Sequence, residues 1–254
     1  MIPRLFLRFC NSIVNLIVIL ALAVSGSYAA YALWDNNQVL AAAENVQADM
    51  IRLKPQVVVS DTDETDNSDA FAELLALNSD VVGWVVMDNT KIDYPVLQGE
   101  DNLTYINKDV YGNFALAGSI YLDSRNDRTF GDQYSLLYGH HMASSNMFGD
   151  LDLYKDEAFF RKNRTGMLIL PEKTYKLEVI SCMLVSASDS FIFEPEFTRD
   201  DINALLDYIE AKSMYLNDDV FQQVHGMDNP KILALSTCSS EFTDARTIVL
   251  TVMK

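Results

Sequence analysis

Residues 231–253, KILALSTCSSEFTDARTIVLTVM, are two strand-forming runs joined by a short polar turn. The runs KILALSTC and RTIVLTVM are rich in Ile, Val, Leu and Thr, a composition typical of β-strands. If they pair as an antiparallel hairpin, the end of the first run meets the start of the second. This pairing would bring Cys238 and Arg246 together.

Six similar runs precede this hairpin, separated by turn residues: VVGWVVM, IDYPVLQ, GSIYLD, YSLLYGH, GMLILP and YKLEVISCMLV. Eight short strands with few helices between them predict a mainly β fold, a closed barrel or a sandwich. An amphipathic pattern at 70–78 predicts a helix before the first strand. A second pattern, over 198–215, predicts one helix before the penultimate strand.

The composition excludes some classes of function. Hydrophobic residues make up 49% of the 254 residues and charged residues 22%, which is ordinary for a globular protein. The net charge of −17 argues against nucleic acid as a partner, because binding a phosphate backbone requires a basic surface. The acidic surface is better explained by solubility.

The N-terminus carries a long apolar segment, about 13–33, that contains no charged residue. Its length is close to the ~20 residues with which a helix spans a bilayer. Arg4 and Arg8 precede it, which favours a cytoplasmic N-terminus and an extracellular remainder. We expect an uncleaved signal anchor. A signal peptide cleaved among the small residues of 25–30 is the alternative.

The chain therefore divides into four predicted parts. Residues 1–12 form the cytoplasmic N-terminus and residues 13–34 the transmembrane anchor. Residues 35–69 form a helical stalk and an acidic linker, since 60–69 contain no apolar residue. Residues 70–254 form the folded domain.

The three cysteines differ in their surroundings. Cys238 lies near the end of its run and shares a strand face with Ser236, so access to its thiol is possible. Cys182 lies in mid-strand among apolar residues, which is typical of a buried, inert thiol. Cys10 lies at the membrane edge and is expected to be inert or lipidated. Strand alternation alone leaves Cys238 as either a nucleophile or a structural thiol.

A reactive thiol requires a neighbouring base or cation. His140 and His141 end a strand and point to opposite faces, so at most one can face Cys238, and both could equally be solvated. His225 lies in QQVHGMD, a predicted polar loop, and is expected to be a surface residue. Arg246 could hold a developing oxyanion, or simply pair on the surface with a carboxylate of the turn.

Together these residues resemble the sortases, membrane-anchored cysteine transpeptidases of Gram-positive bacteria. LSTC is followed eight positions later by Arg246, and YGHHM lies upstream. DVVGWVVMDNTKIDYPVLQGEDNLTYINKDVYGN and GSIYLDSRND resemble the front half of class B sortases. The resemblance extends from about Phe71 to the C-terminus.

The resemblance implies an eight-stranded sortase-type barrel and a class B sortase activity. Cys238 would cleave a C-terminal sorting motif through a thioester, and His140 would act as acid and then as base. Arg246 would orient the motif and stabilise the oxyanion, while Ser236 would line the substrate pocket. The acyl group would pass to an amine of peptidoglycan or its precursor.

The resemblance also defines partners and alternatives. Secreted proteins with a C-terminal sorting signal would be the substrates, and no metal or organic cofactor is implied. A pilin-polymerising sortase, a cysteine protease and a non-catalytic wall or pilus scaffold are the alternative functions. The sorting motif and the amine are left open by the sequence.

Overall fold

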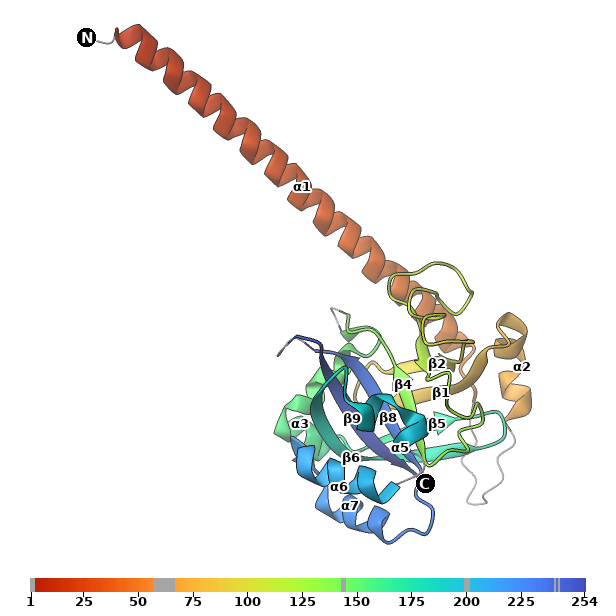
Figure 1. The fold of residues 1–254 in the computed structure, drawn as a ribbon. Coiled ribbons are helices and arrows are strands. Elements are labelled where there is room, and N and C mark those ends of the chain that lie inside the picture. Colours follow the sequence, from red (N-terminus) through yellow and green to blue (C-terminus); the bar gives the residue numbers. More distant parts are fainter. Residues whose placement is uncertain (1–2, 57–66, 143–144, 199–201, 240, 242) are drawn as a thin grey trace. The chain divides into compact units, whose positions relative to one another are not determined.

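The computed structural model describes residues 3–56, 67–142, 145–198, 202–239, 241 and 243–254 (Figure 1). Residues 57–66 lie outside the described residues, and they include most of the acidic linker predicted at 60–69. The chain divides into two units, Met1–Ala41 and Ala42–Lys254. The second unit contains the sheet.

Eight strands close into a barrel, which confirms the predicted fold. Neighbouring strands follow the order β5-β1-β2-β3-β4-β8-β9-β6, and β6 pairs back with β5. A two-residue strand, β7, pairs with Ser181 and Cys182 of β6, beyond the part of β6 that pairs with β5. The strands are β1 (Val81–Met87), β2 (Asp93–Leu97), β3 (Ile120–Leu122), β4 (Tyr134–Tyr138), β5 (Thr165–Ile169), β6 (Thr174–Ser186), β7 (Tyr215–Leu216), β8 (Ile232–Cys238) and β9 (Ala245–Met253).

Two of the strand pairs are parallel, β2 with β3 and β4 with β8. Parallel neighbours require long connections, and both connections contribute to the site described below. The β2–β3 loop covers 98–119, and the segment after β6 carries several helices.

The structure also contains helices in both units. They are α1 (Arg4–Arg52), α2 (Ser68–Leu77), the 3₁₀ helix η2 (Gly149–Lys155), α3 (Glu157–Lys162), α4 (Ser190–Phe193), α5 (Pro195–Thr198), α6 (Ile202–Lys212) and α7 (Asp218–His225). The helices α2 and α6 occupy the two predicted helical patterns. Among the described residues α4, α5 and α7 also precede β8, where the sequence predicted one helix. The helix α7 was not predicted, because it has only three buried side chains among polar residues. His225, predicted to lie in a polar loop, is the last residue of α7 and is exposed.

Strand alternation divides the buried side chains between the inside and the outside of the barrel. On β8, Leu233 and Leu235 belong to the interior cluster, together with Val249 of β9. Ile232 and Ala234 point outward and pack in a second cluster with side chains of α6 and α7. A third cluster covers another part of the barrel with α2 and the end of α1.

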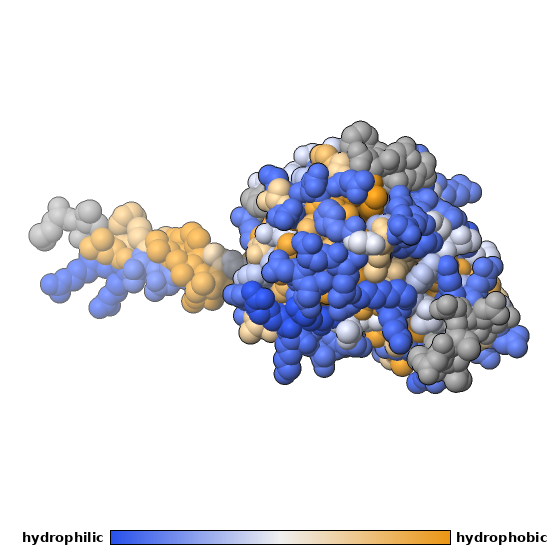
Figure 2. Space-filling model, turned by 90° about the horizontal axis from the view of Figure 1, so that it is seen from below, coloured by the Kyte–Doolittle hydropathy of each residue, from blue (hydrophilic) through white to orange (hydrophobic). Residues whose placement is uncertain are grey.

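The helix α1 changes character along its length. From Phe6 to Trp34 it carries many exposed apolar side chains, visible as the orange stretch in Figure 2. It is long and apolar enough, by length and composition, to cross a membrane. Beyond Ala41 it joins the barrel unit, and Met50 is only 2% exposed, packed with Phe71 and Trp84.

Candidate active site

The parallel pair β4–β8 brings the ends of two distant segments to one edge of the barrel. Tyr138 is in register with Ser236, and the Gly139 amide donates to the Ser236 carbonyl at 3.1 Å. A pocket of ≈ 320 Å³ opens there. Its lining residues are Asn102, Leu103, Ile106, Tyr121, Tyr138, Gly139, His140, Ala187, Phe193, Ser236, Thr237, Cys238 and Arg246.

The predicted hairpin is confirmed. β8 and β9 pair antiparallel, and Cys238 lies directly opposite Arg246. Cys238 is the last residue of β8 and is exposed, whereas Ser236 is buried two residues earlier. Since the sheet faces alternate, all three side chains lie on the same side of the hairpin, and all three line the pocket.

The guanidinium of Arg246 is available to the pocket. Its Nη1 donates to the Ala245 carbonyl at 2.9 Å. Among the described residues no carboxylate forms an ion pair with it, and Glu241 pairs with Lys155 instead. The sequence allowed a surface ion pair between Arg246 and a carboxylate of the turn. Glu241 does not form this ion pair.

Of the two adjacent histidines, only His140 lines the pocket. Its Nε2 lies 2.7 Å from the Ile106 carbonyl. Since a carbonyl can only accept, Nε2 is the donor, and in the neutral ring Nδ1 is then left as the acceptor. His141 instead places its Nε2 3.0 Å from Asp152 Oδ2, on the surface.

The other two cysteines lie elsewhere. Cys182 is fully buried in the barrel interior, as predicted, and burial raises the pKa of its thiol to about 12. Cys10 is on α1, outside the barrel unit. Cys238 is thus the only exposed thiol among the described residues.

Charged side chains tie the turn after β8 to η2. The Lys155 ammonium pairs with Glu241 and, at 2.9 Å, with Asp152. Asp152 also accepts from the Thr247 hydroxyl of β9 at 3.0 Å. Hydrogen bonds from Lys155 and Ser239 lower the pKa of Glu241 to about 2. This turn clamp, Asp152–Lys155–Glu241, fixes both strands of the hairpin beside the pocket.

The sequence did not predict the remaining walls of the pocket. Asn102, Leu103 and Ile106 come from the β2–β3 loop, while Ala187 and Phe193 follow β6. These segments approach β4 only through the closure of the barrel, which no local pattern reveals. Tyr138 could have been found, because strand alternation places it on the same face as His140.

The pocket offers the chemistry of a thiol, an imidazole and a guanidinium. Within the described ranges, no group of three or more His, Cys, Asp or Glu side chains is placed to hold a metal ion.

Several solved class B sortases share this barrel. A Streptococcus pyogenes class B sortase involved in pilus biogenesis is 39% identical with a TM-score of 0.66, over 72% of this chain and 97% of that chain. A Staphylococcus aureus sortase B–substrate complex is 29% identical with a TM-score of 0.67, over 86% and 97% of the two chains. Fold and site thus define the sortase class.

Curated relatives narrow the assignment. Sortase B of Staphylococcus aureus is 32% identical over 185 residues, which is 72% of this chain and 73% of the relative. Sortase B of Listeria monocytogenes is 34% identical over 174 residues, 68% of each chain. No protein-family model matches the chain. The chain belongs to the sortase B family, which confirms the resemblance found in the sequence.

Proposed function

We propose that this class B sortase is a membrane-anchored cysteine transpeptidase that joins secreted proteins to an amine of the cell wall. The observation that supports this most directly is that Cys238, His140 and Arg246 line one pocket. Membership of the sortase B family supports the same chemistry. The Staphylococcus aureus relative has been solved as a complex with substrate.

The first step is acylation of Cys238. Its thiol gives its proton to Nδ1 of His140, its sulfur forms a bond to the scissile carbonyl carbon of the sorting motif, and the π electrons of the carbonyl move onto oxygen. Arg246, opposite Cys238 in the hairpin, stabilises this oxyanion with donors of its guanidinium. When the oxyanion collapses, the C–N bond breaks, His140 supplies the proton of the leaving amine, and a thioester remains.

The second step transfers the acyl group. The amine attacks the thioester carbonyl, His140 accepts the proton that the amine loses, and the Cys238 sulfur leaves with its electron pair. The Ile106 carbonyl fixes the imidazole ring for both transfers through Nε2. Ser236 lines the pocket beside Cys238 and would contact the bound motif.

The anchor places this chemistry at the cell surface. The apolar part of α1 would cross the membrane once, with Arg4 and Arg8 on the cytoplasmic side. The barrel would then lie outside the cell, where secreted substrates and peptidoglycan precursors are found. In this arrangement residues 1–12 would form the cytoplasmic end and residues 13–34 the membrane anchor. Residues 35–69 would form the stalk and linker, and residues 70–254 the catalytic domain.

The proposal is tested by incubating the full chain in detergent with a library of sorting peptides, with and without a triglycine amine. We expect cleavage, and a ligated product only when the amine is present. His140→Ala should lower kcat/KM by about 10²–10⁴-fold, and Arg246→Ala by about 10²-fold or more.

The alternatives give different results. Hydrolysis of the peptide with no ligated product, even when the amine is present, would indicate a cysteine protease. Peptide binding without cleavage would indicate a non-catalytic scaffold. Ligation to a pilin lysine in preference to triglycine would indicate a pilin-polymerising sortase, since the Streptococcus pyogenes relative is involved in pilus biogenesis.

A further inference from the structure

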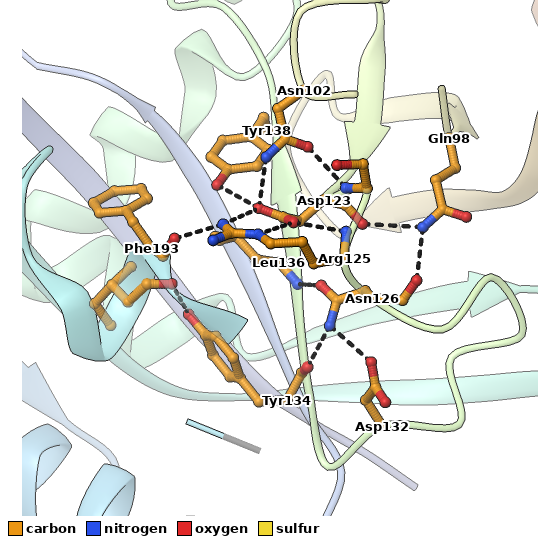
Figure 3. A network of polar contacts seen from close by, with 12 residues as sticks. Gln98, Asn102, Asp123, Arg125, Asn126, Asp132, Tyr134, Leu136, Tyr138 and Phe193 are labelled. Atoms are coloured by element: carbon orange, nitrogen blue, oxygen red, sulfur yellow. Dashed lines mark hydrogen bonds and ion pairs between the residues drawn. The ribbon is translucent and has the colours of Figure 1, made fainter. Parts of the chain in front are cut away.

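A buried ion pair lies behind the pocket without lining it. Asp123 directly follows β3, and its side chain is fully buried, while that of Arg125 is one-third exposed. Arg125 Nε and Nη2 donate to the two carboxylate oxygens at 2.9 and 2.8 Å, a two-point pairing (Figure 3). Neither residue is among those that line the pocket.

The partners of this pair belong to three different walls of the pocket. Asn102 Nδ2 of the β2–β3 loop and the Tyr138 hydroxyl of β4 both donate to Asp123 Oδ2 at 2.9 Å. Arg125 Nη2 also donates to the Phe193 carbonyl, after β6, at 2.7 Å. Asn102, Tyr138 and Phe193 all line the pocket. Figure 3 shows the side chains of Asn102 and Tyr138 and the carbonyl of Phe193 meeting at Asp123 and Arg125.

The charge state of the pair suits this task. Burial alone would raise the pKa of Asp123, but hydrogen bonds from Arg125 and Tyr138 lower it overall, so the carboxylate stays ionised. Burial and the Asp123 charge raise the pKa of Tyr138, so its hydroxyl stays a donor. The Tyr138 ring stacks between Tyr121 at 5.2 Å and Phe193 at 6.3 Å.

We infer that Asp123 and Arg125 are positioning residues that hold the three walls of the pocket in the relative positions that bind the sorting motif. The inference rests on the proposed function. The pair acts through Asn102, Tyr138 and Phe193, whereas His140 is held separately by the Ile106 carbonyl. Loosening the pair should therefore weaken binding of the peptide more than it slows the chemistry at Cys238.

Asp123→Asn is the sharpest variant because neither orientation of an amide satisfies the site. Oδ2 accepts from Arg125, Asn102 and Tyr138, and Oδ1 accepts from Arg125 Nε and the Arg125 amide. An amide nitrogen at either position meets donors instead of accepting from them. Arg125→Lys keeps the cation but cannot make the two-point pairing and also reach the Phe193 carbonyl.

Asp93→Asn is the matched control. Asp93 is a partly buried carboxylate that, like Asp123, accepts from an aromatic donor, Trp84 Nε1 at 2.5 Å, and from a cation, Lys54 at 2.7 Å. Neither Asp93 nor its two partners line the pocket. This variant should reproduce the loss of a structural ion pair without affecting the pocket walls.

The experiment compares the full chain in detergent with Asp123→Asn, Arg125→Lys and Asp93→Asn. For Asp123→Asn we expect KM for the sorting peptide to rise about tenfold with kcat within about threefold. Arg125→Lys should give a smaller rise, and Asp93→Asn none. An unchanged KM in Asp123→Asn, or an equal rise in Asp93→Asn, would overturn the inference.

A second measurement does not depend on activity. Amide hydrogen exchange in Asp123→Asn should become faster in all three walls, within 99–104, 134–138 and 187–193, and in none of them in Asp93→Asn. Faster exchange confined to the surroundings of residue 123 would contradict a positioning role. A wild-type chain that cleaves no peptide would contradict the proposed function, and the exchange result would still decide the inference.

Discussion

At the scale of single residues, the site depends on where a thiol lies along its strand. Cys238 ends β8 and reaches solvent, whereas Cys182 lies within β6 and faces the barrel interior. The pKa of Cys182 is raised to about 12 by burial, so its reactive thiolate is almost absent near neutral pH. Two cysteines in similar strands are thereby given different chemistry.

This difference predicts selective alkylation. Iodoacetamide at pH 8 should modify Cys238 of the folded protein at least about 100-fold faster than Cys182, because alkylation requires an accessible thiolate. Peptide mapping by mass spectrometry measures both rates in one sample. Unfolding in guanidinium should make the rates similar, and equal rates in the folded protein would contradict the burial of Cys182.

Gly118 supports the carbonyl that holds His140. It adopts φ +59°, and a Cβ on it would lie 2.4 Å from the Ile106 carbonyl oxygen. A side chain at this position therefore cannot be accommodated unless the carbonyl moves away from His140 Nε2. Gly112, in the same loop, adopts φ +81° with no atom within 4 Å of the corresponding position.

Gly118→Ala should therefore lower kcat at least about tenfold by displacing the hydrogen-bond partner of His140. Gly112→Ala is the control, because both variants place alanine at positive φ, at a cost of about 1 kcal/mol, but only Gly118→Ala meets the carbonyl. Steady-state kinetics and thermal unfolding separate the two effects. Equal losses of kcat in both variants would show that the Ile106 carbonyl does not matter.

Sequence reasoning identified Cys238, Arg246, His140 and Ser236 because strand alternation, hairpin pairing and the family pattern all act over short, readable segments. It did not reveal Asn102, Asp123 or Phe193. Their roles arise from contacts between β3, the β2–β3 loop and the segment after β6, which depend on the closure of the barrel. Asp123 lies in GSIYLDSRND, a stretch that carries the family resemblance, but no local pattern shows that it would contact Asn102 and Tyr138.

At the scale of elements, the turn clamp joins the β8–β9 hairpin to η2. Lys155 pairs with Glu241 of the turn and with Asp152, which accepts from Thr247 on β9. The hairpin that carries Cys238 and Arg246 is thus held at its turn as well as along its ladder. The sequence predicted the hairpin but not the clamp, because Lys155 precedes Glu241 by 86 residues.

The clamp predicts a defined pH dependence. The pKa of Glu241 is lowered to about 2 from 4.5, so its ion pair contributes stability above about pH 4.5 and loses it as the pH falls toward 2. Glu241→Gln should therefore be less stable than wild type at pH 7, with the difference shrinking on acidification. Urea unfolding at pH 7, 4 and 3 measures this.

Glu157→Gln is the control for this experiment. Glu157 pairs with Arg161 on the exposed surface of α3, and such helix pairs contribute little to stability. Its difference from wild type should be small at pH 7 and change little with acidification. A pH-independent difference for Glu241→Gln would show that the ion pair with Lys155 does not contribute.

At the scale of the whole molecule, the compact unit begins earlier than the predicted boundary at residue 70. Met50 is buried with Phe71 and Trp84, and Lys54 pairs with Asp93 of β2. Asn67 donates to the Leu170 carbonyl after β5 at 2.9 Å. The sequence indicated a helix here, but its burial depends on the surface of the barrel that receives it.

Truncation should show this difference. A chain of residues 42–254 should unfold at a temperature at least about 5 °C higher than a chain of residues 70–254, because the latter loses the Met50 packing. Scanning calorimetry of both measures the shift. Met50→Ala in the chain of residues 42–254 should lower the free energy of unfolding by about 2–4 kcal/mol. Identical unfolding temperatures of the two truncated chains would contradict a structural role for residues 42–69.

Intact-protein mass spectrometry after brief incubation with a sorting peptide decides whether Cys238 carries the acyl group. We expect wild type and Cys182→Ala to gain the mass of the acyl fragment, and hydroxylamine to release it as a hydroxamate. Cys238→Ala should gain no mass and cleave no peptide. Cleavage by Cys238→Ala, or an adduct that survives in it, would contradict a nucleophilic role for Cys238.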